Sequence, residues 1–300
     1  MLGRARLPRP TAGSRSWIAG RNCSPPSDRS RCPVAARGGR IVLRVSIWRS
    51  RQALFLLVRR DLSQKYRKLR LGYLWAILEP LGMSVTMWFV FEILLGGRDM
   101  GQQPYYLFLT VAILPWWWFT SGISSSTRAF VGFSRTLPVS VLPTQFSVVR
   151  VLITRTFDFL FSLPLIVFAM LVTWTFPGIN IGFFLLAFLI QLVLMYGLSL
   201  LVASWSFLVP DFARIVRIIL RAAFYLSPVL YSLALIPDEA RSAAALNPLA
   251  GILTLYRVGW WPEEHVAMTG YAISFGVALF FLIAGIVTFR RLEHRILKEA

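Results

Sequence analysis

Long apolar stretches constrain this chain more than any other feature of its sequence. A helix that crosses the hydrocarbon core of a bilayer needs about 20 mainly apolar residues. Six windows meet that requirement, namely residues 74–95, 105–123, 151–173, 179–208, 215–235 and 271–289. Pro115 and Pro228 interrupt the second and fifth windows, which membrane-buried helices tolerate when neighbours satisfy the freed carbonyls. The sequence therefore predicts an all-α membrane protein with six transmembrane helices.

The basic residues are concentrated at one end of the chain. Of 32 Lys and Arg, 18 precede Gly72, where only Asp28 and Asp61 oppose them. The short segments after the second, fourth and sixth windows are also basic, whereas the alternate loops hold only Arg98, Arg241 and Arg257. Basic loops stay on the cytoplasmic side. The sequence therefore predicts cytoplasmic N- and C-termini, even if the nine Arg of the first 40 positions are discounted.

Residues 1–40 are rich in Arg, Pro, Ser and Gly and show no hydrophobic periodicity. Such a segment buries too little apolar surface to offset the entropy of ordering, so we expect a disordered basic tail without a cleaved leader. An alternative is an over-extended gene start, because no Met follows Met1 until Met83. The two Cys and two His do not have the spacing of metal ligands, so no metal site is predicted.

Two shorter segments predict helices that do not cross the membrane. Within residues 45–70, apolar side chains recur with a period close to 3.6 while Arg residues gather on another face, which indicates an amphipathic helix at the membrane interface. The alternative is an exposed helix whose charges only set the topology. On the outer side, Asn247 and Pro248 fit the N-cap and first position of a helix. That helix is too short to cross, so it is expected to lie at the interface or to be re-entrant.

No catalytic constellation is present. None of the three Lys residues follows a Gly, so the chain has no P-loop, and any ATP must be bound by another chain. We therefore expect no enzyme activity and no cofactor bound by this chain itself. The candidate intramembrane charges are Glu79, Glu92, Arg155 and Asp158, all near the ends of predicted helices. Arg155 and Asp158 are three residues apart and can neutralise each other, which favours a structural role over a proton relay.

Aromatic residues gather in "LPWWWF" at residues 114–119 and in "GWW" at residues 259–261. Trp concentrates at membrane interfaces regardless of function, so a membrane-interface belt is one interpretation. The other is that Trp116, Trp117 and Trp118 face a conduit, where flat rings stack on sugar faces.

Four stretches together resemble the permease subunits of type-2 ABC transporters, specifically the exporters of O-antigen, capsule, teichoic acid or galactan. They are "RRDLSQKYRKLRLGYLWAILEPL", "LPWWWFTSGISSSTRAF", "YLSPVLY" and "LNPLAGILTLYR". The resemblance covers about residues 45–295, with residues 72–293 as the transmembrane domain. The Arg-rich tail departs from the family pattern, which usually begins near the amphipathic helix.

The resemblance implies the permease subunit of an ATP-driven exporter that moves a lipid-linked polysaccharide across the bacterial cytoplasmic membrane. Such a subunit forms a homodimer and binds two separate ABC ATPase subunits. By analogy, residues 133–144 are the coupling segment that docks on the ATPase, with Phe133, Arg135, Pro138 and Pro143 as candidates; a simple turn is the alternative. The amphipathic helix would act as a gate helix, and short outer re-entrant helices would precede the last span.

Phosphate groups of lipid-linked saccharides lie at the cytoplasmic headgroup level, where the basic residues before the first span are expected. Arg binds phosphate in a bidentate manner, so Arg59, Arg60 and Arg67 are candidates for the substrate headgroup, while most other charges would bind membrane lipid. Two rival functions remain: a type-2 ABC permease for drugs or lipids, and an integral membrane protein without a transport role. The basic tail has no organised face for nucleic acid.

Overall fold

The computed structural model describes residues 47–67, 72–96, 101–130, 144–237, 247–264 and 268–299. The chain divides into two units, Met1–Leu43 and Arg44–Ala300, and every described residue belongs to the second. Within those ranges the regular structure is entirely helical, which confirms the predicted all-α class. The first helix is α1 (Ile47–Arg67).

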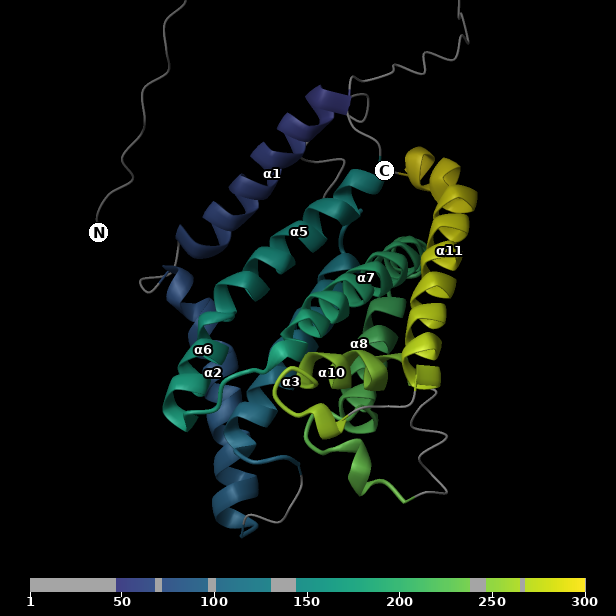
Figure 1. The fold of residues 1–300 in the computed structure, drawn as a ribbon. Coiled ribbons are helices and arrows are strands. Elements are labelled where there is room, and N and C mark those ends of the chain that lie inside the picture. Colours follow the sequence, from purple (N-terminus) through teal and green to yellow (C-terminus); the bar gives the residue numbers. More distant parts are fainter. Residues whose placement is uncertain are drawn as a thin grey trace, which may run out of the picture. The chain divides into compact units, whose positions relative to one another are not determined.

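Five helical segments are long and apolar enough to cross a membrane (Figure 1). They are α2 (Trp75–Trp88) with the π-helical turn Phe89–Leu94, α3 (Tyr105–Ser126), α5 (Gln145–Ser162) continued by α6 (Pro164–Thr173), α7 (Gly182–Leu208) with the preceding 3-10 turn Ile179–Ile181, and α11 (Met268–Glu299). Each corresponds to one of the predicted windows.

The fifth predicted window, residues 215–235, is not a continuous helix. It consists of α8 (Phe212–Leu226), a turn at residues 227–231 and the 3-10 turn Leu233–Leu235. Pro228 explains the break, because a proline pushes the preceding residue out of the helical region, and Ser227 is extended at φ −97° and ψ 146°. With 15 residues, α8 is roughly 22 Å long, shorter than the ~30 Å hydrocarbon core. The described residues thus give five candidate spans by length and composition, and a sixth span at α8 stays a prediction.

The core of the bundle is α3. Its residues from Leu107 to Pro115 are all buried, and the helix contacts α2, α5, α7 and α8, as well as the short helix α10 (Pro248–Arg257). A helix that is apolar all round is one that other elements surround. The buried Gln191 amide of α7 donates to the carbonyl of Pro115 at 2.8 Å, so α7 is fixed to the turn of α3 that contains the proline.

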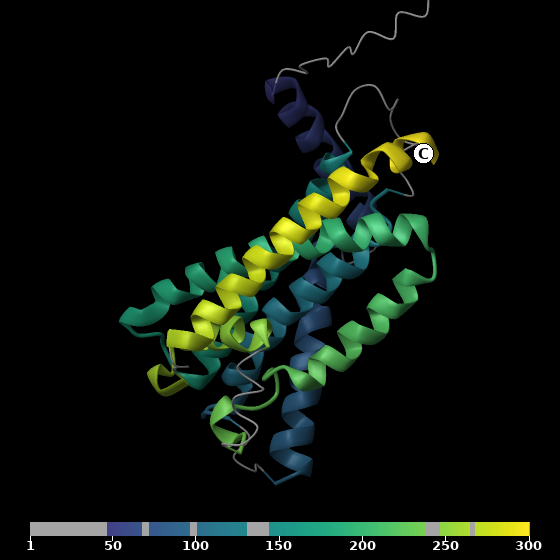
Figure 2. The same ribbon diagram turned by 90° about the vertical axis from the view of Figure 1, so that its right-hand side faces the viewer.

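Particular helix ends gather at each end of the bundle. The starts of α1 and α5 and the end of α11 lie at one end, whereas α10 lies beside the start of α11 (Figure 1). The arrangement is compatible with the predicted topology, and the end of the bundle that holds α10 is called the outer end after that prediction. Figure 2 shows α8 at one side of the bundle, where it contacts α7 and α3.

Helices α7 and α11 approach each other closely, and a glycine on each helix permits this contact. A Cβ atom placed on Gly285 of α11 would collide with the backbone of Gly197, and one on Gly197 would collide with the backbone of Phe281 and Leu282. Small residues of this kind let membrane helices approach backbone to backbone.

We expect Gly285→Ala to separate α7 from α11 and to lower the free energy of unfolding by about 1–3 kcal/mol, because the obstructing atoms are backbone rather than flexible side chains. The midpoint of thermal unfolding of the detergent-purified protein measures this. Gly276→Ala is the matched control on the same helix, since nothing lies within 4 Å of its added Cβ. Equal midpoints for the two variants would contradict the close approach.

Candidate functional site

The outer end of the bundle is organised around α10. As predicted, Asn247 caps the helix, its Oδ1 accepting from the Leu249 backbone N at 3.0 Å, with Pro248 in the first turn. The Asn247 amide also donates to Ser227 Oγ at 3.1 Å and to the Leu226 carbonyl at 3.3 Å. The start of α10 is therefore attached to the point at which α8 ends.

Arg257, at the last position of α10, is completely buried and binds the non-helical segment after α8. Its guanidinium donates to the carbonyls of Pro228 at 2.8 Å, Val229 at 2.7 Å and Tyr231 at 3.3 Å. The same group lies 3.6 Å above the centre of the Phe108 ring of α3. Burial lowers the pKa of Arg257 to about 10, while the nearby Glu264 acts in the opposite direction. Arg257 therefore stays protonated at neutral pH.

Further hydrogen bonds join the segments around Arg257. The Tyr105 hydroxyl donates to the Leu230 carbonyl at 2.9 Å, and the Ser232 hydroxyl donates to buried Glu264. Trp261 Nε1 donates to the Gln103 carbonyl at 3.1 Å. These contacts fix the segments on either side of α10, while Asn247 and Arg257 hold α10 itself, and we call α10 with these contacts the outer plug.

The sequence pattern did not identify Arg257 as a site residue. It was only one of three basic residues in the outer loops. The available signal was an Arg at the end of an amphipathic ten-residue helix that begins with an N-cap, a position from which an Arg can reach carbonyl groups.

A second polar region lies between α1 and α5, which run side by side in the same direction (Figure 1). The predicted pair of Arg155 and Asp158 is present at 3.2 Å, and Lys65 of α1 joins it with Nζ 2.6 Å from the same carboxylate oxygen. One turn earlier, Asp61 pairs with Arg150 Nε at 3.0 Å. Ion pairs on one face of α1 therefore join it to α5.

Partial burial at this contact also affects Asp61. Desolvation raises the pKa of Asp61 above its ordinary value, and the charges of Arg150 and Arg60 act in the opposite direction.

Two adjoining cavities open beside these ion pairs. Lys65 and Arg155 line both of them; one reaches Glu79 and Trp117, and the other is lined by Asp61 and Arg150 among others.

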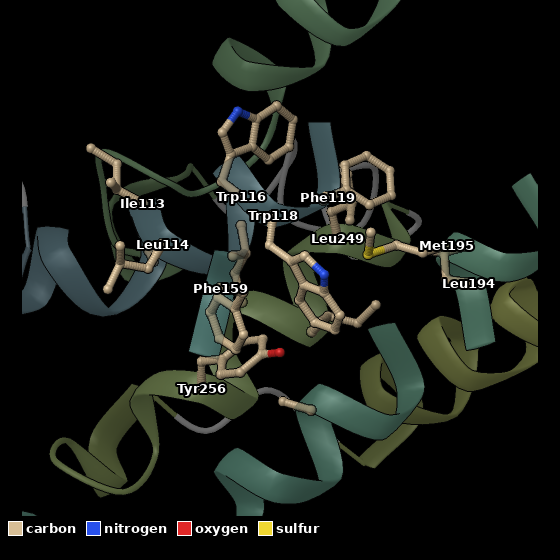
Figure 3. Packing of buried hydrophobic residues seen from close by; sticks show 14 of the residues in the cluster. Ile113, Leu114, Trp116, Trp118, Phe119, Phe159, Leu194, Met195, Leu249 and Tyr256 are labelled. Carbon is tan, nitrogen blue, oxygen red and sulfur yellow. The ribbon is translucent and has the colours of Figure 1, made fainter. Parts of the chain in front are cut away.

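The three candidate channel tryptophans have different surroundings. Trp118 is 2% exposed and its ring stacks between Phe159 and Phe188, with ring centres 4.8 and 4.9 Å away. Figure 3 shows Trp118 and Phe159 within the buried cluster. Trp116 is also buried, against Phe224 of α8. Trp117 is half-buried and lines a cavity. A conduit role stays a prediction for all three, and Trp117 has the most accessible ring.

The candidate headgroup residues Arg59 and Arg60 line neither cavity. Arg59 and Arg60 are exposed on α1, and a separation of two residues places Arg59 on the opposite face of the helix from Asp61. Arg67 is the last residue of α1. The coupling candidates Phe133, Arg135, Pro138 and Pro143 lie outside the described residues.

An amphipathic face of α8 is exposed. Ile215, Ile218 and Ile219 are at least half exposed. Three arginines that recur at positions i, i+3 and i+7 are also exposed, namely Arg214, Arg217 and Arg221. The spacing places the arginines on one side of the helix. In the sequence they indicated only topology, although three Arg at helical spacing at the start of an apolar window are unusual.

These features define a multi-pass helical membrane protein with a polar contact between α1 and α5 and an immobilised plug at the outer end. Residues 52–261 match the ABC-2 type transporter family, and the chain belongs to that family. It follows that the chain is a transport subunit of the cytoplasmic membrane.

Three curated relatives extend this comparison. The chain is 29% identical over 253 residues to the O-antigen export system permease protein RfbA of Myxococcus xanthus, covering 82% of this chain and 95% of the relative. It is 25% identical over 256 residues to RfbA of Klebsiella pneumoniae, covering 81% and 92%. It is 28% identical over 254 residues to the polysialic acid transport protein KpsM of Escherichia coli, covering 82% and 90%.

We expect Arg257→Met to lower the free energy of unfolding by about 3–5 kcal/mol, because three carbonyls would lose a charged donor in a buried site. Arg257→Lys should fall between the wild type and Arg257→Met, since one ammonium cannot reproduce the planar fork. Thermal unfolding in detergent measures both variants. Arg214→Gln is the control, because Arg214 is 77% exposed; a loss of stability as large as that of Arg257→Met would show that removal of any Arg is damaging.

Proposed function

We propose that this chain is the permease subunit of an ATP-driven exporter that moves a lipid-linked polysaccharide across the bacterial cytoplasmic membrane. The observation that carries the proposal is the alignment over four fifths of the chain with relatives named for O-antigen export and polysialic acid transport. The particular polysaccharide, among O-antigen, capsule, teichoic acid and galactan, is left open.

The exposed face of α8 supports a homodimer. Charged side chains within a membrane-spanning bundle face a protein partner or a water-filled path, because hydrocarbon does not solvate them. Arg217 and Arg221 lie beyond the first turn of α8 and are exposed in the single chain. A second copy placed against this face would enclose them in a shared path between the two permeases.

The energy source in this proposal is a pair of separate ABC ATPase subunits, which bind the ATP. Phe133, Arg135, Pro138 and Pro143 are the residues that we propose to contact them. The ATPases would act on α5, which begins directly after that segment, and α5 is joined to α1 by the ion pairs of Asp61 and Asp158. A movement of α5 would thus be transmitted to α1 directly through these ion pairs.

The closure around α10 supports a path that is shut in the resting state. Arg257 and Asn247 hold α10 to residues 226–231, the segment that follows the exposed helix α8. Separation of two permeases along α8 would therefore act directly on this plug.

We expect a tagged form of the chain to co-purify with a P-loop ATPase from native membranes, and we expect depletion of the chain to abolish the cell-surface polysaccharide while its lipid-linked form accumulates inside. Quantitative proteomics and carbohydrate staining of inner and outer membrane fractions measure this. Co-purification without a change in polysaccharide would favour the drug or lipid permease, and the absence of any ATPase would favour a protein without a transport role.

Arg59, Arg60 and Arg67 are proposed to contact the phosphate of the lipid-linked substrate. Gln at each position should reduce export more than tenfold at normal membrane insertion, because a bidentate contact with phosphate is lost. Arg290→Gln, at an exposed position of α11, controls for the removal of a positive charge elsewhere. Unchanged export in all three variants would show that these residues do not contact the substrate and would favour binding to membrane lipid.

A further inference from the structure

The two cavities beside α1 and α5 place opposite charges at separate positions. One cavity, of about 320 Å³, is lined by three cations, Lys65, Arg150 and Arg155, against the single acid Asp61. The other, of about 160 Å³, shares Lys65 and Arg155 but adds Asp158 and Glu79. The first cavity therefore has an excess of positive charge, and the second extends from those cations to an acidic end.

Glu79 defines that acidic end. Asp158 is committed to Lys65 and Arg155, at 2.6 and 3.2 Å. Glu79 is exposed on α2 and takes no part in the ion pairs found among the described residues. A carboxylate at the cytoplasmic end of an apolar helix is costly unless a cation or water accompanies it. The arrangement thus leaves a carboxylate available for a positive group that enters the cavity.

The surroundings of the cavities are apolar. Trp117, Leu114 and Phe159 form part of the lining of the smaller cavity. The helices that border it also expose large apolar side chains, among them Phe55, Trp75 and Phe161, at 64%, 45% and 44%. A ligand that reaches the charged groups from this side must be amphipathic, as membrane lipids are.

We propose that these cavities bind the head of a zwitterionic aminophospholipid, with its phosphate at Lys65, Arg150 and Arg155 and its ammonium at Glu79. Phosphate oxygens accept charge-assisted hydrogen bonds from Lys and Arg, and an ammonium offers three donors to a carboxylate. The two cavities together hold three cations and three acids, so a head without net charge matches them. An anionic head would meet the same cations but would be opposed by Glu79.

The proposed site is distinct from the candidate headgroup residues for the cargo. Arg59 and Arg60 line neither cavity. The lipid would occupy the contact between α1 and α5 whatever the exported molecule is, so the site does not depend on the proposed function. It would make the position of α1 sensitive to the composition of the inner leaflet.

Competition between two lipids tests the proposal. The full-length protein in detergent is incubated with equal amounts of dioleoyl phosphatidylethanolamine and dioleoyl phosphatidylglycerol, and native mass spectrometry counts the bound lipids. We expect the wild type to retain phosphatidylethanolamine preferentially. Glu79→Gln should reduce the ratio of bound phosphatidylethanolamine to phosphatidylglycerol about fivefold, the size expected for one partly exposed charge pair, because only the contact with the ammonium is lost.

Two controls separate this effect from general damage. Glu92→Gln removes a carboxylate from the outer end of the same helical segment and should leave the ratio unchanged. Arg155→Gln should reduce the binding of both lipids alike, since the phosphate is common to them. The proposal is wrong if the wild type prefers phosphatidylglycerol, if Glu79→Gln behaves like Glu92→Gln, or if Arg155→Gln binds both lipids normally.

Discussion

Backbone carbonyls that leave a helix inside an apolar bundle must find donors, because no water is present to hydrogen-bond them. In this chain the requirement arises where Pro228 ends α8, and the side chain of Arg257 meets it with hydrogen bonds to Pro228, Val229 and Tyr231. The interaction fixes α10 at the same time, since Arg257 is its last residue. It also places a cation over Phe108, within the buried run of α3. The break in α8, the outer plug and the central helix therefore depend on one guanidinium group.

At the other end of the bundle, ion pairs join α1 to α5. Lys65 and Asp61 are four residues apart on α1, so they project from one face of the helix, and each meets an opposite charge on α5. These charges are partly exposed, with side-chain accessibilities between 15% and 38%. They orient α1 along α5 while its other faces carry exposed Arg59 and Arg60 and the exposed apolar residues Phe55 and Leu56. One helix thus combines a protein-facing ionic edge with a surface that fits the membrane interface.

Five of the six predicted spans follow from apolar windows, because a helix in hydrocarbon satisfies its own backbone and needs only length and apolarity. The fifth window gives a shorter helix, because hydropathy does not register the geometric effect of Pro228 on Ser227. The pair of Arg155 and Asp158 was predictable because it is local in sequence, whereas its third member, Lys65, is 93 residues from Asp158. The N-cap of α10 was likewise local, but the partners of Arg257 lie 26 to 29 residues away. Pattern and spacing therefore identified elements and local contacts, and folding determined which distant charges and carbonyls meet.

The two polar regions differ in what it costs to open them. Partly exposed ion pairs contribute about 0–1 kcal/mol each, so α1 can leave α5 when lipid or solvent takes over its charges. Removal of Arg257 from its carbonyls would instead leave buried groups without partners, at about 1–3 kcal/mol for each. Under the proposed coupling, a force applied at the start of α5 would therefore move α1 first, and it would reach the outer plug only when the larger cost can be met. For an exporter this order is favourable, since the inner side becomes accessible to cargo while the outer side is still closed.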